Sequence, residues 1–516
     1  MKSLIKVKAN SSKRPIDPMI YSAFIEHLGE CIHNGLWAYD PVNVPLLEDN
    51  PFLIRVRRDV LEALKNLKPT VIRAFGGCYS DVYHWKDAIG SRDSRKTVKN
   101  LQWNRFPMKL IKRISPIIEN QFGTDEFLTL CEAVNAEPYL NINYSTGTPQ
   151  EAAEWVEYCN GSINSEFGAL RAKYGRKEPY NVKFWGIANE IWGPQEIGHE
   201  KDPEAYGKKY VSFAKVMRKK DPNIKLVAVG WWKSNWNRAV LNSIGEKWVD
   251  YLSIHHYVPL PFNIKFLIGK KHPHKKKNYY SLMSAHLGIK KAINKAWEDI
   301  ISVFGSDTHV RIAFDEWGIW YKVWDMIKTN YNLQDGLCAA LNLMEFQRLS
   351  EKSPMANISE TINVFGAIQT DPDGLILTPI YHALKMLAEH SQRNLIEGLV
   401  VDCGTFKSKK YGQIRESLNT PLIECNVTIN DEGNALSIVI INKHLEQSID
   451  IDLEITGFSP IKTGQLIRLN SDSPFDYNTL KDRNRIRPVE TKIENLGPKL
   501  ILELPAHSIN ILKLNA

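Results

Sequence analysis

The stretch KFWGIANEIWG, residues 183–193, is a short apolar run that ends in an asparagine and a glutamate. A nearly continuous apolar run is typical of a parallel strand that is covered on both faces. A glutamate at the end of such a strand costs free energy unless a partner or a reaction uses it. Glu190 is therefore a candidate functional residue, and the rest of the chain indicates what surrounds it.

Similar strand-like runs recur along most of the chain, with helix-period segments such as 55–67, 125–136, 333–349 and 379–390 between and after them. The predicted strands are residues 19–27, 70–75, 138–144, 181–190, 224–230, 250–257, 310–317 and 361–368. This alternation predicts a (β/α)8 TIM barrel. A doubly wound sheet is the alternative fold, but no glycine-rich phosphate loop opens any of these helices.

After about residue 390 apolar and polar residues alternate, with turn residues at Asp431, Glu432 and Gly433. This pattern is typical of an antiparallel β-sandwich. We therefore predict a catalytic barrel over residues 16–388 and a β-sandwich domain over residues 389–516. The alternating strand in residues 1–15 is expected to join the sandwich.

Composition narrows the possible partners of this 516-residue chain. No apolar run approaches the roughly 18 residues of a membrane helix, so no membrane partner is expected. The net charge of +8 is dispersed apart from Lys275–Lys277, so that run is expected to be a solvated loop and no nucleic-acid partner is expected. Seven scattered cysteines without CxxC spacing, and no signal-like N-terminus, predict a cytoplasmic protein with reduced thiols.

Polar or aromatic residues stand at nearly every predicted strand end, where a TIM barrel places its active site. They are Glu26, His27, Arg73, Asn141, Asn143, Asn189, Glu190, Trp231, Trp232, His255, His256, Tyr257, Asp315, Glu316, Trp317 and Asn363. A polar pocket with aromatic walls suits a sugar, which needs hydrogen bonds for its hydroxyls and flat faces for its C–H groups. Trp317 and the other tryptophans of this set, with Trp236, Trp320 and Trp324, are candidates either for sugar stacking or for rim packing.

Two carboxylates stand out, because Glu190 ends the predicted fourth strand and Glu316 ends the seventh. Side chains from opposite strands point across one mouth, where they can straddle a single bond. Retaining glycosidases place two carboxyl groups about 5–5.5 Å apart and inverting enzymes about 6.5–9.5 Å apart, and both remain open from sequence. No metal-ligand spacing surrounds His255, His256, His272 or His274, so neither a metal nor a cofactor is expected.

Several motifs in this order resemble glycoside hydrolase family 51, the α-L-arabinofuranosidases. They are FIEHLGECIHNGLW (24–37), GGCYSDVYHWKDAIG (76–90), FGTDEFLTLCEAVNAEPYLNIN (122–143), EAAEWVEYCN (151–160), KFWGIANEIWG (183–193), DYLSIHHY (250–257), AFDEWGIWY (313–321), MANISETINVF (355–365) and TPIYHALKM (378–386). The resemblance covers nearly the whole chain. It implies a retaining exo-acting enzyme that removes terminal arabinofuranosyl groups from arabino-oligosaccharides.

The resemblance also implies roles for individual residues. Glu190 would be the general acid/base and Glu316 the nucleophile. Substrate contacts would come from Glu26, Asn189, His255 and Tyr257, and Arg73 is expected to support the site by a charge-assisted bond. A homo-oligomer, often a hexamer, is a further implication.

The chain departs from the family pattern at three positions. Phe75 stands where a proline usually precedes Gly76-Gly77, Cys78 stands where many members have a substrate-binding asparagine, and Glu360 stands where many have a pocket glutamine. A glutamate at position 360 accepts hydrogen bonds but donates one only when protonated. The alternatives are therefore another specificity on the same barrel (a β-xylosidase, another furanosidase or an endoglucanase) and a carbohydrate-binding protein without turnover.

Overall fold

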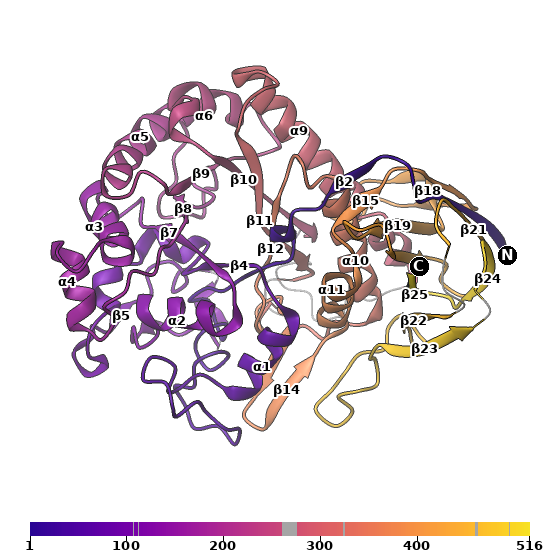
Figure 1. The fold of residues 1–516 in the computed structure, drawn as a ribbon. Coiled ribbons are helices and arrows are strands. Elements are labelled where there is room, and N and C mark those ends of the chain that lie inside the picture. Colours follow the sequence, from indigo (N-terminus) through magenta and orange to yellow (C-terminus); the bar gives the residue numbers. More distant parts are fainter. Residues whose placement is uncertain (107, 112, 261–275, 323–325, 460–462, 495) are drawn as a thin grey trace.

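Eight parallel strands form a closed barrel in the computed structural model, which describes residues 1–516 except 107, 112, 261–275, 323–325, 460–462 and 495 (Figure 1). In chain order they are β3 (Ser22–Phe24), β4 (Val71–Ala74), β7 (Glu137–Ile142), β8 (Phe184–Ile187), β9 (Lys225–Val229), β10 (Tyr251–Pro259), β11 (Arg311–Trp320) and β12 (Met355–Ile358). β12 pairs in parallel with β3 and closes the ring. The predicted TIM barrel is confirmed.

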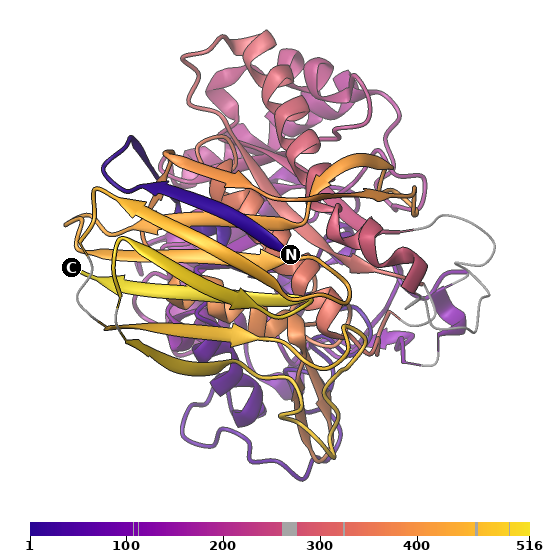
Figure 2. The ribbon, with the colours of Figure 1, turned by 90° about the vertical axis from the view of Figure 1, so that its right-hand side faces the viewer.

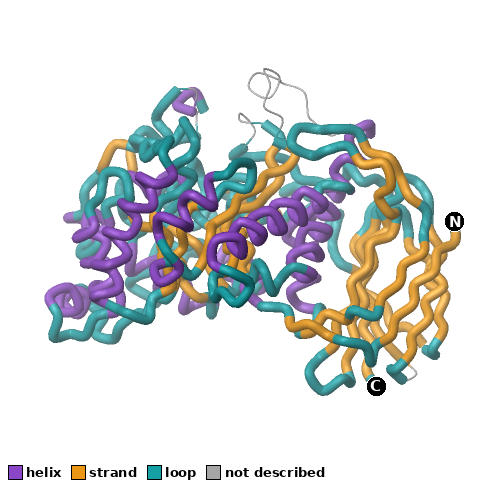
Figure 3. The backbone as a smooth tube through the Cα atoms, turned by 90° about the horizontal axis from the view of Figure 1, so that it is seen from above, coloured by secondary structure: helices purple, strands orange, loops and turns teal. Residues whose placement is uncertain are grey.

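Helices lie around this barrel and cover the outer face of its strands (Figures 1 and 3). They are α1 (Arg58–Leu67), α2 (Thr124–Val134), α3 (Pro149–Asn160), α4 (Glu166–Lys173), α5 (Pro203–Lys220), α6 (Trp236–Ile244), α8 (Tyr279–Met283), α9 (His286–Phe304), α10 (Leu333–Arg348) and α11 (Pro379–His390). In α1 the apolar residues recur on one face, and that face is buried. Strands covered in this way need the continuous apolar runs that the sequence contains.

The eighth strand lies earlier in the chain than the sequence suggested. The predicted strand over residues 361–368 is wrong, because β12 spans Met355–Ile358. Asn363 and Phe365 have φ angles of 57° and 54°, which no strand accommodates. The apolar run after residue 360 instead forms a buried turn, which leads into the hairpin of β13 (Ile368–Asp371) and β14 (Gly374–Leu377).

The C-terminal part of the chain forms two sheets of mostly antiparallel strands, as predicted. One sheet has the order β16 (Leu399–Asp402), β1 (Lys2–Lys8), β21 (Ile449–Thr456) and β24 (Lys499–Leu504). The other has the order β2 (Lys13–Pro15), β15 (Asn394–Ile396), β19 (Ile423–Ile429), β20 (Ala435–Asn442), β25 (Ser508–Asn515), β22 (Thr463–Leu469) and β23 (Val489–Glu494). Short two-stranded pairs are formed by β5 (Val98–Lys99) with β6 (Ile117–Ile118) and by β17 (Thr405–Ser408) with β18 (Ser417–Pro421).

The first strand of the chain lies within the four-stranded sheet, as Figure 2 shows for the N-terminal segment. β1 pairs in parallel with β21 and antiparallel with β16. Its inward residues Ile5 and Val7 are buried, which accounts for its alternating sequence. The division of the chain between residues 388 and 389 stays a prediction.

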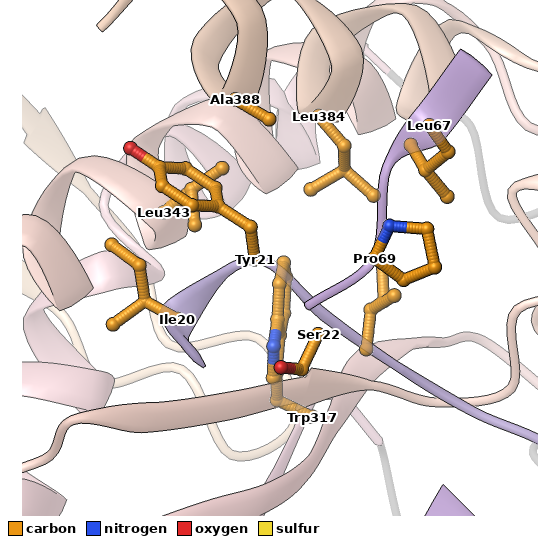
Figure 4. Close-up of a pocket in the computed structure, with 10 residues that line it drawn as sticks. Ile20, Tyr21, Ser22, Leu67, Pro69, Trp317, Leu343, Leu384 and Ala388 are labelled. Atoms are coloured by element: carbon orange, nitrogen blue, oxygen red, sulfur yellow. The ribbon is translucent and has the colours of Figure 1, made fainter. Parts of the chain in front are cut away.

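An apolar pocket lies on the outer side of the barrel wall, between the strands and the helices α10 and α11 (Figure 4). It is lined by Ile20, Tyr21, Ser22, Leu67, Pro69, Trp317, Leu343, Ile358, Leu384 and Ala388. No charged side chain lines it, so it offers no group for acid or base chemistry.

Buried charges join the barrel helix α10 to the sandwich strand β19. Glu424 Oε2 lies 2.8 Å from Lys443 Nζ, and Glu424 Oε1 lies 2.6 Å from Arg348 Nη2. Lys443 is 0% exposed, so no water compensates its charge. Burial would raise the pKa of Glu424, but Lys443 and Arg348 hold it well below its usual range. The carboxylate therefore stabilises the fold above the pKa it has in the unfolded chain, and this contribution is lost as the pH falls through its folded pKa.

We expect Glu424→Gln to lower the free energy of unfolding by about 3–5 kcal/mol, because it leaves Lys443 and Arg348 without their shared anion. Thermal or denaturant unfolding at neutral pH measures this loss. Glu446→Gln is the matched control, since Glu446 is exposed and pairs with Lys276 at the surface. Equal destabilisation by the two substitutions contradicts the prediction.

Candidate active site

The mouth of the barrel gathers the polar strand ends that the sequence predicted. His255 of β10 lies beside Glu316 of β11 in the strand register, and the register shifts between Ser253 and His255. A second shift lies in β11, between Phe314 and Trp317. Such irregularities re-aim side chains at the rim of a barrel. They place His255, Glu316 and Tyr257 of β10 on one side of the mouth.

Glu190 reaches this mouth from a turn that follows β8. The φ angles of Ala188 and Glu190 are 77° and 43°, in the left-handed region. The Gly193 N–H donates to the Glu190 carbonyl at 2.6 Å and closes the turn. A non-glycine residue in the left-handed region costs free energy and is concentrated at functional sites. The chain thus leaves the strand direction at the residue that carries the carboxyl group.

His255 lies between the two glutamates. Its Nδ1 is 2.8 Å from Glu190 Oε1 and 3.4 Å from Glu316 Oε2. One atom from each of the three side chains falls within 4.8 Å of the others. Burial would lower the pKa of His255, but Glu316, Asp315 and Glu190 raise it to about 10. His255 is therefore an imidazolium at neutral pH, and its charge offsets the repulsion between the carboxylates.

Glu316 has donors on both carboxyl oxygens. Tyr257 donates its hydroxyl to Oε1 at 2.5 Å, and Arg73 Nη1 donates to Oε2 at 3.1 Å. Burial raises the pKa of Glu316 and Glu190 adds to the rise, whereas His255, Arg73 and Tyr257 oppose it. The donors thus favour the ionised form in a buried place. The expectation that Arg73 supports the site agrees with this contact.

Arg73 is 1% exposed and also holds the residue before Glu190. Its Nη2 donates to Asn189 Oδ1 at 2.7 Å, and its Nε faces Asn141 Oδ1 at 3.4 Å. Asn189 Nδ2 in turn lies 3.7 Å from Cys78 Sγ. One guanidinium on the second barrel strand therefore orders groups from the third, fourth and seventh.

Asp315 is a residue whose role the sequence did not reveal. It is fully buried, its Oδ2 accepts the Tyr139 hydroxyl at 2.7 Å, and its Oδ1 accepts the Ser253 hydroxyl at 2.6 Å. His255 Nε2 lies 3.2 Å from Oδ1, so Asp315 orients the imidazolium. Its position directly before Glu316 could have suggested a place in the site, but adjacent residues of a strand normally face opposite sides of the sheet. The register shift at this point removes that alternation.

A second carboxyl group missed by the sequence analysis lies beside Cys78. Glu196 Oε1 accepts the Cys78 thiol at 3.1 Å, and Gln102 Nε2 donates to Glu196 Oε2 at 3.2 Å. Burial raises the pKa of Glu196 well above its ordinary value, and Glu190 adds to the rise. Nothing in the spacing of Glu196, six residues after Glu190, distinguished it from a surface glutamate.

Glu26 and Glu360 occupy neighbouring places at the ends of paired strands, and both are buried. Trp317 is not brought to the mouth. Its side chain is buried on the outer face of β11, where its ring packs on Phe346 of α10 and lines the apolar pocket (Figure 4). The strand alternation explains this, since Glu316 points into the barrel and Trp317 away from it.

Other tryptophans provide flat surfaces near the turn that carries Glu190. Trp192 and Trp231 stack with ring centroids 4.7 Å apart, and both are partly exposed. Trp232 Nε1 donates to the His255 carbonyl at 3.2 Å. Of the other residues considered from sequence, four lie outside the described residues: His272, His274, Lys275 and Trp324.

Two sets of three side chains offer close donor atoms to a metal ion among the residues that the structure describes. They are Glu190 with His255 and Glu316, and Cys78 with Glu190 and Glu196. In the first set the His255 nitrogen that faces the carboxylates already contacts both, and in the second set the thiol donates to Glu196. These atoms are thus already engaged in contacts with one another.

The geometry of the site fits cleavage of a glycosidic bond. One oxygen of Glu190 and one of Glu316 lie within 4.8 Å of each other, which is nearer to the about 5–5.5 Å of retaining glycosidases than to the about 6.5–9.5 Å of inverting ones. Glu316 has cationic and phenolic donors that favour its ionised form, and Glu190 lies partly buried on a turn at the mouth. The described part of the chain contains no helix long and apolar enough to cross a membrane.

Comparison with known families and proteins agrees with this geometry. The family described as "Alpha-L-arabinofuranosidase 1 domain" matches residues 63–278, and "Alpha-L-arabinofuranosidase C-terminal domain" matches residues 315–508. "Alpha-L-arabinofuranosidase C" of Emericella nidulans is 32% identical over 97% of this chain and 95% of that protein. "Intracellular exo-alpha-L-arabinofuranosidase" of Bacteroides ovatus is 31% identical over 99% of this chain and 95% of that protein.

Solved structures show the same similarity. The arabinose complex of α-L-arabinofuranosidase from Thermotoga maritima has a TM-score of 0.87 and 31% identity, with full coverage of both chains. The GH51 α-L-arabinofuranosidase from Thermotoga petrophila has a TM-score of 0.86 and 32% identity, covering 99% of this chain and 100% of that one. The resemblance seen in the sequence motifs is confirmed: this chain belongs to glycoside hydrolase family 51, the α-L-arabinofuranosidases.

Proposed function

We propose that this glycoside hydrolase is a retaining exo-α-L-arabinofuranosidase in which Glu316 is the nucleophile and Glu190 the general acid/base. The observation that carries the proposal is the closeness of the two carboxyl groups, since one oxygen of Glu190 and one of Glu316 lie within 4.8 Å of each other. This supports a retaining reaction, because an inverting one needs a gap of about 6.5–9.5 Å for an additional water.

The different surroundings of the two glutamates support the assignment of roles. Arg73 and Tyr257 donate to Glu316, which favours the carboxylate form that a nucleophile requires. Glu190 has neither donor, and its side chain is more exposed, so it can reach the leaving group and later a water. His255 lies within hydrogen-bond reach of Glu190 and can orient its carboxyl group.

The proposed reaction has two steps. First, a Glu316 carboxylate oxygen bonds to the anomeric carbon while the bond to the leaving oxygen breaks, and that oxygen takes the proton of Glu190. Second, Glu190 takes a proton from a water whose oxygen bonds to the anomeric carbon, and the ester bond to Glu316 breaks. Two inversions give net retention of configuration. The residues present supply the acid, the base and the nucleophile of both steps.

Sugar binding is assigned to the groups that surround these carboxyls. We propose that Asn189, held by Arg73, faces the sugar 2-hydroxyl, and that Glu26, Glu360, Cys78, His255 and Tyr257 line the rest of the glycone pocket. The buried position of Trp317 removes it from this set.

We propose short arabino-oligosaccharides as the substrate and an intracellular location. The name of the Bacteroides ovatus relative includes both "intracellular" and "exo", and all seven cysteines of this chain are free thiols, as expected in a reducing compartment. The homo-oligomer, with a hexamer suspected, stays a prediction.

A panel of aryl glycosides tests the substrate class. We expect release of the aryl group from the α-L-arabinofuranoside in preference to the β-D-xyloside, the β-D-glucoside and other furanosides, because the family shares the arabinofuranosyl specificity. Release from the β-D-xyloside alone would favour a β-xylosidase. No release from any glycoside would mean that the pocket binds sugar without turnover.

Azide distinguishes the two glutamates. We expect Glu316→Ala to lose nearly all activity and to regain it with azide as the inverted glycosyl azide, because azide replaces the nucleophile. Glu190→Ala should lose about 10²–10⁴-fold with poor leaving groups, and with an activated aryl substrate azide should give the retained product. Glu62→Ala, at an exposed position of α1, is the control. The same azide anomer from both variants contradicts the assignment.

The pH profile tests whether the hydrogen bond from Tyr257 stabilises the Glu316 carboxylate. Because the pKa of Glu316 is raised by burial, activity should fall as the pH drops through a value above that of an ordinary glutamate. Tyr257 opposes the rise, so Tyr257→Phe should move the acidic limb of kcat/KM to a higher pH. Tyr280→Phe, whose hydroxyl accepts the Leu445 N–H away from the mouth, is the control. An acidic limb that stays in place or moves to lower pH contradicts the prediction.

A further inference from the structure

Glu26 and Glu360 form a pair of touching carboxyl groups at the end of the first and last barrel strands. Each stands two residues beyond its strand, and these strands, β3 and β12, are hydrogen-bonded neighbours. The two side chains lie within hydrogen-bond reach of each other. Glu26 is 3% exposed and Glu360 is 1% exposed, so bulk water reaches neither.

The surroundings supply too few donors for two carboxylates. The Tyr79 N–H donates to Glu26 Oε1 at 2.6 Å, and the Cys31 thiol lies beside Glu360. No N–H or O–H group of the described residues donates to Glu360 Oε2, although this atom is fully buried. A buried oxygen without a donor is rare and requires an explanation. A proton held by the pair provides one.

The charges around the pair also favour a bound proton. Among the described residues, Arg73 is the cation that acts on Glu26, but its guanidinium is already engaged by Glu316 and Asn189. The other titratable groups that act on either carboxyl are acidic or neutral: Cys31, Cys78, Tyr79, Glu196 and Glu316. Two buried carboxylates in contact, without a cation of their own, repel each other until one binds a proton.

We propose that Glu26 and Glu360 share one proton at neutral pH, and that this singly protonated pair is a pH-dependent element of sugar binding. The inference rests on the proposed role of this pocket in binding the glycone. The pair then presents both a donor and acceptors, whereas two carboxylates present acceptors alone. A sugar hydroxyl can both donate a hydrogen bond to the singly protonated pair and accept one from it. Two carboxylates can only accept its hydrogen bond, and they repel its oxygen.

The direction of the pH effect follows from the position of the proton. Burial raises the pKa of Glu26 to about 8 and raises that of Glu360 well above its ordinary value. The pair therefore keeps a proton at neutral pH and loses its last one only in the alkaline range, as Glu360 ionises. Sugar binding should be tight while the pair holds this proton and weaken once it is lost.

Glu360→Gln is the test, because the amide replaces the carboxyl group without a change of shape and donates at every pH. KM and kcat for the aryl α-L-arabinofuranoside are measured against pH for the wild type, for this variant and for the control Glu62→Gln. We expect the KM of the wild type and of the control to rise in the alkaline range by about tenfold per pH unit once the last proton of the pair is lost, while the KM of Glu360→Gln stays flat. Parallel KM profiles in all three proteins overturn the proposal.

Infrared spectroscopy gives a readout that does not depend on turnover. The wild type minus Glu360→Gln difference spectrum at neutral pH should contain the C=O stretching band of a protonated carboxyl group, and the band should vanish in the same alkaline range in which KM rises. Bands from other protonated carboxyls are present in both proteins and cancel. A difference spectrum that contains only carboxylate bands overturns the shared proton. No hydrolysis of any glycoside, with the band present, would instead count against the proposed function alone.

Discussion

The buried guanidinium of Arg73 is the interaction on which the active site depends. It contacts the Glu316 carboxylate, the Asp315 carbonyl and the Asn189 amide from the centre of the barrel mouth. Without a positive charge at this depth, the acidic groups there would repel one another and bind protons. Together with the His255 imidazolium, Arg73 keeps Asp315 charged and opposes the rise in the pKa of Glu316 that burial causes.

The same balance distinguishes the carboxyl groups by their surroundings. Glu316 and Asp315 have Arg73 and His255 in direct contact, whereas Glu196, Glu26 and Glu360 have no cation in contact among the described residues and have pKa values raised by burial. A barrel mouth is well suited to this division, because every strand contributes one or two side chains to a space that excludes water. Small differences in the neighbours of each carboxyl then set how readily it binds a proton.

Backbone irregularities occur where the chemistry is. Ala188 and Glu190 adopt left-handed conformations after β8, and the registers of β10 and β11 shift near His255 and Glu316. A regular strand would point consecutive residues to opposite faces. The shifts instead bring Asp315 and Glu316 into one hydrogen-bond network around His255. The surrounding strands and helices, with their continuous apolar contacts, hold these strained segments in place.

The sequence by itself determined the barrel, the mostly antiparallel C-terminal sheets and the polar residues at the strand ends. Buried parallel strands, amphipathic helices and alternating strands each have their own hydrophobic pattern, and these patterns can be recognised in the sequence. It also supplied Glu190 and Glu316 as charged residues at the ends of apolar runs. It misplaced the eighth strand, since the apolar run after Glu360 is a buried turn and not a strand. Only the tertiary structure decided that Trp317 faces away from the mouth, that Asp315 orients His255, and that Glu26 touches Glu360. These relations join residues far apart in the chain or depend on a shifted strand register, and neither leaves a periodic signal in the sequence.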